Sequence, residues 1–186
     1  MDGRVQRLKQ AVTVIQQGGI VAYPTESCFG LGCDPRNQSA VRKLLRLKKR
    51  SYEKGLILIA AHYLQLRPYI AEISAATEAR VQATWPGFET WILPARAGLS
   101  RLLTGRHDAI AVRVTAHSTA AALCRMTRHA LVSTSANIPG QAPLRHARLV
   151  NAVFKGKIDF ILDAPVGAEN SPSRIRVAGT GVVVRH

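Results

Sequence analysis

The sequence is short of several residue types, and each shortage excludes a class of protein. It has three cysteines, Cys28, Cys33 and Cys124, and no CxxC pair, which argues against a disulfide framework and against a zinc site. The six histidines show no HxxxH or HExxH spacing, so we expect no metal ion held by the protein itself. Aromatic residues make up 5% of the chain and form no cluster, which argues against a base-stacking RNA-binding module.

Long apolar runs and acidic residues are scarce as well. No apolar stretch approaches the roughly 18 residues of a membrane span, and the N-terminal stretch MDGRVQRLKQ lacks the apolar core of a secretory signal. We therefore expect a cytoplasmic protein with no membrane contact. The chain has 11 Asp and Glu against 26 Lys and Arg, which gives a formal net charge of +15. Such a charge attracts polyanions, so a nucleotide or nucleic-acid partner is expected.

The remaining composition fits one globular domain. A chain of 186 residues with 47% hydrophobic and 20% charged residues is typical of a single domain, and no linker divides residues 1–186. Apolar periodicity predicts helices that alternate with strands. The main helices are expected over 4–17, 62–69, 74–84 and 146–154, and two more are expected to begin at the N-caps Ser39 and Ser118. The main strands are expected over 20–23, 55–60, 88–93, 109–114, 130–133 and 158–162, and a final pair of short strands ends the chain. This alternation predicts an α/β fold with a mixed, open sheet covered by helices.

The common nucleotide and nucleophile motifs are absent. The chain has no GxxxxGK[ST] phosphate loop, no GxGxxG opening a helix and no GxSxG elbow. The turn-rich stretch PTESCFGLGCDPRN contains only GLG, which is too weak a signal for a nucleotide fold. If a nucleotide binds, side chains and irregular backbone must hold its phosphates.

The stretch LKKRSYEKG at 47–55 concentrates four cations just before an apolar strand. One interpretation is a solvated helix end, because cations favour the last turn of a helix. The other is a phosphate grip. Lys48 and Arg50 can bind one triphosphate together only if the chain leaves the helix near Lys48, and an extended chain would then turn Lys49 outward.

Two further stretches place polar groups on strand faces. In AIAVRV, Arg113 shares its face with two alanines, which leaves room beside its planar fork for a carboxylate or phosphate; a surface ion pair is the alternative. In STSAN, an extended chain lines up Ser133, Ser135 and Asn137 on one face, where hydroxyls and an amide can bind a small polar substrate. The alternative there is an ordinary turn, since Ser, Thr and Asn are common in loops.

Taken together, these stretches resemble the YrdC/Sua5 family in its short, single-domain bacterial form. The resemblance covers nearly the whole chain and rests on the order and spacing of its motifs. They are VAYPTESCFGLGCDP, LKKRSYEKGLILI, WPG, TGRHDAIAVRV, LVSTSANIPG and SPSRIR. The resemblance implies a twisted open sheet around a deep basic cleft.

The family's KxR and SxN signatures match Lys48, Arg50, Ser135 and Asn137, which the resemblance implies are catalytic. Expected contacts to L-threonine are Thr25, Arg113, Ser135 and Ser173. Expected contacts to ATP are Lys48, Arg50, Lys54, Ser133, Asn137, Arg145 and Arg185. Ile59 and Ala109 depart from the longer two-domain relatives, which have a histidine and a threonine at these positions.

The resemblance implies the chemistry of threonylcarbamoyl-AMP synthesis. The substrates would be ATP, L-threonine and bicarbonate, the products threonylcarbamoyl-adenylate and pyrophosphate, and Mg²⁺ would arrive with ATP. Downstream proteins would use the product for the t6A modification of tRNA, and tRNA itself is a further expected partner of the basic surface. Two alternatives stay open: a non-enzymatic RNA-binding or ribosome-maturation protein, and the carbamoyl-transfer domain of hydrogenase maturation, which normally occurs fused to other modules.

Overall fold

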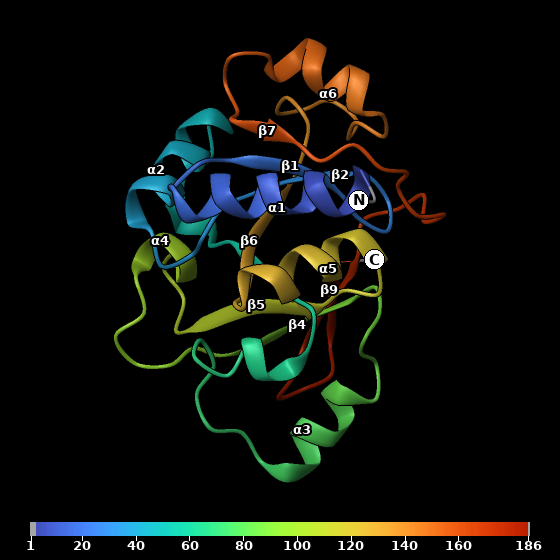
Figure 1. Cartoon of the computed structure of the whole chain (residues 1–186). Helices are drawn as coiled ribbons and strands as arrows, with labels where there is room; N and C mark the ends of the chain where they lie inside the picture. Colours follow the sequence, from blue (N-terminus) through green and yellow to red (C-terminus); the bar gives the residue numbers. More distant parts are fainter. Residues whose placement is uncertain (1–2, 186) are drawn as a thin grey trace.

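The computed structural model describes residues 3–185, with the side chain of Arg185 outside that description. Helices and strands alternate along most of the chain (Figure 1). The helices are α1 (Gly3–Gln16), α2 (Gln38–Leu47), α3 (Ala75–Gln82), α4 (Arg101–Thr104), α5 (Ser118–Thr127) and α6 (Ala147–Phe154), with short 3₁₀ turns η1 (Tyr52–Lys54) and η2 (Tyr63–Gln65). The strands are β1 (Val21–Pro24), β2 (Phe29–Gly32), β3 (Ile57–Ala60), β4 (Glu89–Pro94), β5 (Ala109–Val114), β6 (Leu131–Ser135), β7 (Phe160–Ile161), β8 (Arg174–Val177) and β9 (Val183–Arg185).

All described strands join one sheet in the order β7-β1-β2-β6-β3-β5-β4-β8-β9. The sheet is mixed, since β3 pairs with β5 in parallel while β6 pairs antiparallel with both β2 and β3. The α/β fold with a mixed sheet is therefore confirmed. Strand β6 lies between two strands that precede it by more than seventy residues in sequence, so it brings the SxN motif beside the first half of the chain.

Two hydrophobic clusters cover the two faces of the sheet. On one face α1 and α5 lie together (Figure 1), and Ile15 and Leu123 pack with Val21 and Tyr23 of β1. On the other face the apolar side of α2 packs through Leu44 against the strands, with α6 and the short helices around it. The period-2 alternation along β1 and β3 explains this division, because neighbouring side chains point to opposite faces.

The helix and strand predictions hold in outline and differ in detail at specific residues. Strand β2 forms within the stretch predicted as a loop, because Gly32 allows β6 to approach closely: a Cβ there would lie 2.3 Å from the carbonyl oxygen of Val132. Helix α2 is capped by Asn37 rather than Ser39, and α5 by His117 rather than Ser118. The spacing of Val5 to Leu8, Val12 and Ile15 predicts all four on the apolar side of α1, but Val5 is exposed.

Two segments are shorter than the sequence pattern indicates. The helix expected over 62–69 is the 3₁₀ turn η2, in which Gln65 is held by the chain around it: its side chain accepts from the Ala61 N–H and donates to the carbonyl of Cys124. The expected strand 158–162 pairs with β1 only at Phe160 and Ile161. No helix within the described residues is long and apolar enough to cross a bilayer.

Candidate functional site

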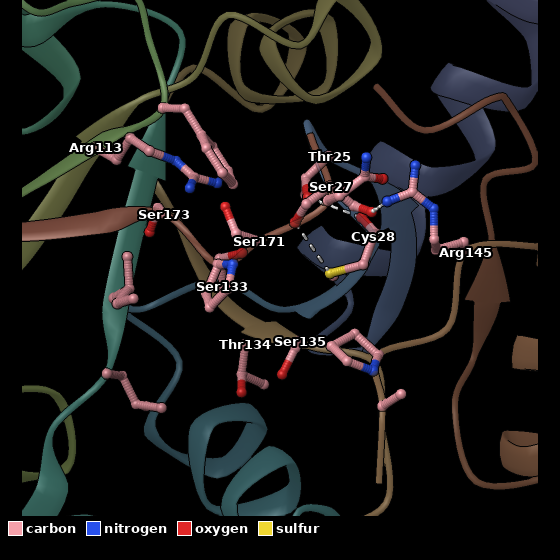
Figure 2. Close-up of a pocket in the computed structure, with 18 of the residues that line it drawn as sticks. Thr25, Ser27, Cys28, Arg113, Ser133, Thr134, Ser135, Arg145, Ser171 and Ser173 are labelled. Atoms are coloured by element: carbon pink, nitrogen blue, oxygen red, sulfur yellow. Dashed lines mark hydrogen bonds between the residues drawn. The ribbon is translucent and has the colours of Figure 1, made fainter. Parts of the chain in front are cut away.

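A pocket of about 530 Å³ opens between the ends of the central strands and the loop before β8. Figure 2 shows Arg113 and Arg145 on opposite sides of it, with hydroxyl-bearing side chains between them. The lining residues with polar side chains are Thr25, Ser27, Cys28, Arg50, Arg113, Ser133, Thr134, Ser135, Arg145, Asn170, Ser171 and Ser173. Among the described residues of this lining there are three arginines, no carboxylate and no histidine. The pocket therefore has a positive field and many neutral hydrogen-bonding groups; the depth expected of a family cleft stays a prediction.

Strand pairing brings the serines of β6 into the pocket. Ser135 pairs with Gly30 of β2, and Ser133 pairs with Ile57 of β3, so both lie where three strands meet. Gly30 faces the same space, and a Cβ at this position would come within 3.3 Å of the Ser133 hydroxyl. The small residues of GLG thus serve the close approach of strands, which a loop interpretation of this stretch did not anticipate.

Arg113 points from β5 into the pocket and is almost fully buried. Its guanidinium donates to Glu26 Oε2 at 3.3 Å, and its central carbon lies 5.1 Å from the centre of the Phe88 ring. Glu26 is held in turn by the Thr115 hydroxyl, at 2.7 Å, and by the Ala116 N–H, at 3.0 Å. Glu26 and Phe88 thereby fix the guanidinium of Arg113 on two sides. The N–H groups on its pocket side can donate to an anionic oxygen.

Thr25 lies in the tight turn between β1 and β2. Its backbone N–H and its hydroxyl both donate to the carbonyl of Cys28, at 2.9 and 2.8 Å. The Cys28 thiol also lines the pocket, and burial raises its pKa above the ordinary value. The raised pKa favours the thiol over the thiolate, which is the nucleophilic form of cysteine.

Lys48 does not line the pocket. Its side chain instead binds the SxN motif, whose Ser135 is part of the pocket lining. The buried ammonium donates to Ser135 O at 2.8 Å, to Asn137 Oδ1 at 2.7 Å and to the carbonyl of Asn137. The Ser135 hydroxyl donates to the same Asn137 Oδ1 at 2.8 Å, and Asn137 Nδ2 donates to the carbonyl of Gln141. Burial, with the nearby Arg50 charge as the second cause, lowers the pKa of Lys48 to about 8. Lys48 and the SxN motif are therefore one hydrogen-bonded unit.

The segment after Lys48 is a left-handed turn, so the prediction of an extended chain is wrong. Helix α2 ends at Leu47, and Lys49 has φ 46°, which lets the Arg50 N–H donate to the carbonyl of Leu45. The turn places the buried Lys48 and the half-buried Arg50 toward the interior and leaves Lys49 exposed. The separation of Lys49 from its neighbours is confirmed, although its cause is a helix C-cap and not strand alternation.

Arg50 contributes its guanidinium to the pocket wall. It donates to the carbonyl of Gly55 at 2.8 Å, and burial lowers its pKa below the ordinary value. Lys54, the other cation expected at ATP, lies in η1, is exposed and does not line the pocket. Its place in a short 3₁₀ turn directs it away from the strands that form the cavity.

Arg145 and Ser173 reach the pocket through two loops. Arg145 donates to three backbone carbonyls, those of Ser27 at 2.6 Å, Glu169 at 2.6 Å and Gly167 at 3.1 Å. Ser173 is buried, and its hydroxyl lies 2.9 Å from that of Thr90. Arg185 is in β9, but its side chain lies outside the described residues, so its expected ATP contact stays a prediction.

Some residues that line the pocket, and one that supports its lining, were missed at the sequence level. Glu26 sits in the PTE motif, and its acidity in a chain with few acids was a usable signal. Phe88, Asn170 and Ser171 carry no signal of their own, because only the folded chain brings the segment after WPG and the polar loop 166–173 to the same cavity.

Comparisons with known proteins agree with this architecture. A family model for Sua5, YciO and YrdC, described as telomere recombination, matches residues 13–186. A protein of Nitrosococcus oceani named threonylcarbamoyl-AMP synthase is 48% identical over 179 residues, covering 96% of this chain and 97% of its own. A protein of the same name from Idiomarina loihiensis is 58% identical over 159 residues, covering 84% and 86%.

Solved structures give the same result. P. abyssi Sua5 complexed with L-threonine matches with a TM-score of 0.85 and 32% identity, over 91% of this chain and 50% of that one. The chain thus spans about half the length of P. abyssi Sua5. The E. coli YciO crystal structure, at 24% identity and a TM-score of 0.83 over 97% of this chain and 89% of that one, shares the fold.

Proposed function

Because the chain belongs to the Sua5/YciO/YrdC family, we propose that it is a threonylcarbamoyl-AMP synthase. The enzyme joins L-threonine, bicarbonate and ATP into threonylcarbamoyl-adenylate and releases pyrophosphate. Its near-full-length similarity to relatives of that name supports the assignment. The structural observation that carries it is one pocket in which three arginines and a set of hydroxyls converge without a carboxylate or histidine among the described lining residues.

This set of residues suits adenylate formation. The amine of L-threonine and bicarbonate condense to a carbamate with loss of water. An oxygen of that carbamate then bonds to the α-phosphorus of ATP while the bond to the β-phosphate breaks and pyrophosphate leaves, so catalysis depends on positioning and on stabilising the phosphate charge. Neither requirement needs a covalent nucleophile, which matches the protonated thiol of Cys28. Mg²⁺ enters with ATP and is held mainly by phosphate oxygens in our proposal.

We assign the residues to two ends of the pocket. Arg113 binds the carboxylate of L-threonine, with Thr25, Ser135 and Ser173 supplying neutral contacts nearby. Arg50, Ser133 and Arg145 face the nucleotide. Lys48 and Asn137 act as positioning residues, because they hold Ser135 and the following turn in place. Lys54 is left out of the direct contacts on account of its exposure, and the roles of Arg145 and Arg185 rest on the family resemblance.

The same proposal extends to the setting of the enzyme. It acts as one domain over residues 1–186 in the cytoplasm, and it supplies threonylcarbamoyl-adenylate to proteins that complete the t6A modification of tRNA. Its formal charge of +15 supports a weak association with tRNA.

Pyrophosphate release tests the proposed function directly. Purified protein is incubated with ATP, L-threonine and bicarbonate, and each of the last two is omitted in turn. We expect release to depend on both. Release that continues undiminished without threonine would overturn the assignment and favour a plain ATPase.

A further inference from the structure

A second, shallower cavity lies on the outer side of Arg50. We call it the outer groove; its volume is about 450 Å³, and it runs between the end of α2, the left-handed turn and α4. Figure 1 shows α2 and α4 next to each other at this edge of the molecule. The lining residues are Arg42, Leu45, Arg46, Lys49, Arg50, Ser51, Tyr52 and Leu102.

Four of these residues are cations, and none is an acid. Among the described residues no ion pair involves Arg42, Arg46, Lys49 or Arg50, and the Arg42 guanidinium donates to the neutral amide oxygen of Gln38. Elsewhere in the same chain exposed cations do find carboxylates, as Lys43 does at Asp159. The outer groove therefore has an unbalanced positive charge, which an anion with several oxygens would neutralise.

The cations of the outer groove come from the last turns of α2 and from the left-handed turn that follows it. Arg42 and Arg46 are one helical turn apart and share a face of α2. The turn at Lys49 then reverses the chain and brings Lys49 and Arg50 to the same groove.

Arg50 connects the outer groove to the substrate pocket, because it lines both cavities. The bond from its guanidinium to the Gly55 carbonyl uses one of five donor hydrogens, so others remain for a ligand on either side. On the proposed function, the phosphates nearest Arg50 are those that leave as pyrophosphate. A site beyond Arg50 would receive that product.

We propose that the outer groove is a binding site for the pyrophosphate product, held by Arg46, Lys49 and Arg50 after it leaves the substrate pocket. The proposal rests on the proposed function for the identity of the anion. Arginine suits it because a planar guanidinium binds two phosphate oxygens at once, and Lys49 adds a mobile point charge. The expected consequence is that pyrophosphate binds while AMP occupies the substrate pocket.

The test is a titration of pyrophosphate into protein saturated with AMP, followed by calorimetry. The variant combines Arg46→Gln with Lys49→Asn, since asparagine tolerates the left-handed backbone at position 49. The matched control combines Arg148→Gln with Lys157→Asn, two exposed cations at and after α6 that make the same change of net charge. We expect pyrophosphate affinity to fall at least tenfold in the groove variant and less than twofold in the control.

Product inhibition gives a second readout in the same variants. The inhibition constant of pyrophosphate should rise by the same factor as the dissociation constant, and by at least fivefold more than any change in the KM for ATP. The single variant Arg46→Gln should lose part of the affinity, which guards against a folding defect in the double variant.

Several outcomes would overturn the outer groove as a pyrophosphate site. They are unchanged pyrophosphate affinity in the groove variant, an equal loss in the control, and a loss of RNA binding with pyrophosphate binding intact. Failure of the proposed function is separate, because the titration needs no turnover. If threonine-dependent release is absent while the groove variant still loses pyrophosphate affinity, the anion site stands and the assigned reaction falls.

Discussion

At the scale of single residues, the site depends on buried charges that hold each other in place. Arg113 and Glu26 are both buried, and each is further fixed by neighbours, Arg113 by the Phe88 ring and Glu26 by Thr115 and Ala116. Removing one member of a buried pair leaves the other charge uncompensated, which is far more costly than losing both. Binding and stability effects at Arg113 can therefore be separated by the choice of variant.

We expect Arg113→Ala to raise the KM for L-threonine about 10- to 150-fold, the factor that corresponds to one charge-assisted hydrogen bond of roughly 1.5–3 kcal/mol. The KM for ATP should change much less. The same variant should lower the free energy of unfolding by about 3–5 kcal/mol, since Glu26 is left unpaired. Steady-state kinetics and urea unfolding measure the two effects.

The double variant Arg113→Ala with Glu26→Gln is the control for this interpretation. It should recover much of the stability, because no buried charge remains, without recovering the affinity for threonine. Equal weakening of threonine and ATP binding in Arg113→Ala would show that Arg113 is assigned to the wrong substrate.

Lys48 and Asn137 give a second prediction at this scale. Lys48→Met and Asn137→Ala should each reduce adenylate formation at least tenfold, because either change loosens the end of β6, where Ser135 lies, and the turn that follows it. The double variant should be little worse than either single one, since residues in one hydrogen-bond network are not additive. A double-mutant cycle on kcat/KM measures this coupling. Arg50→Ala loses a direct phosphate contact, so its effect on kcat/KM should add to that of Lys48→Met. Independent, additive losses at Lys48 and Asn137 would contradict the shared network.

At the scale of elements, the loop 163–173 is hydrogen-bonded to the β1–β2 turn and contributes residues to the pocket lining; we call this loop the strap. The Gly167 N–H donates to Thr25 O at 2.9 Å, and the Glu169 N–H donates to Glu26 O at 3.1 Å. Arg145 fastens the same loop through the carbonyls of Gly167 and Glu169. Asn170, Ser171 and Ser173 reach the pocket because the strap is anchored on the β1–β2 turn, which itself carries Thr25.

Gly167 permits the close approach of these two segments. A Cβ at this position would lie 2.5 Å from Glu26 O and 2.9 Å from Glu26 Cα, and these backbone atoms cannot move without disturbing the turn. We expect Gly167→Ala to lower the free energy of unfolding by about 1–3 kcal/mol, the usual cost of overpacking. It should also raise the KM for threonine.

Gly179→Ala is the matched control for the strap, because nothing lies within 4 Å of a Cβ built there and its backbone is not left-handed. It should leave the free energy of unfolding and the KM for threonine close to those of the unaltered protein. Urea unfolding and threonine kinetics of the two alanine variants, measured side by side, decide the question. Similar behaviour of both variants would mean that the strap does not position the site.

At the scale of the whole molecule, the excess of cations dominates the interactions with other molecules. The charge of +15 is spread over many exposed side chains, while the described aromatic side chains form no stacking platform. Contacts to RNA phosphates are then expected without readout of bases. Such contacts release counterions and weaken as salt is added.

We expect tRNA to bind weakly, with little sequence preference and with an affinity that falls by at least tenfold between about 50 and 200 mM salt. Fluorescence anisotropy with two tRNAs and an unrelated RNA of equal length measures both properties. Tight binding that distinguishes tRNAs at physiological salt would show a base-reading surface that we have not identified.

The sequence by itself determined the fold class and most of the pocket. The spacing of apolar residues reflects the local geometry of helices and strands, so it located α1, α2, β4 and β5 to within a few residues. The alternation in β5 correctly predicted that Arg113 faces away from the side that carries Val112 and Val114. The family resemblance grouped Thr25, Arg50, Ser133, Ser135 and Ser173 as substrate contacts, and the structure has all five in the lining of one pocket.

Only the tertiary structure decided how these groups work together. Local preferences speak against a strand at Phe29–Gly32, yet the approach of β6 requires the two glycines there. Whether Lys48 faces substrate or backbone depends on residues 135–137, which lie far along the chain. In the structure the Lys48 ammonium donates its hydrogen bonds to these residues. The partners of Glu26 and the anchoring of the strap arise in the same way, because long-range packing brings together residues that no local pattern relates.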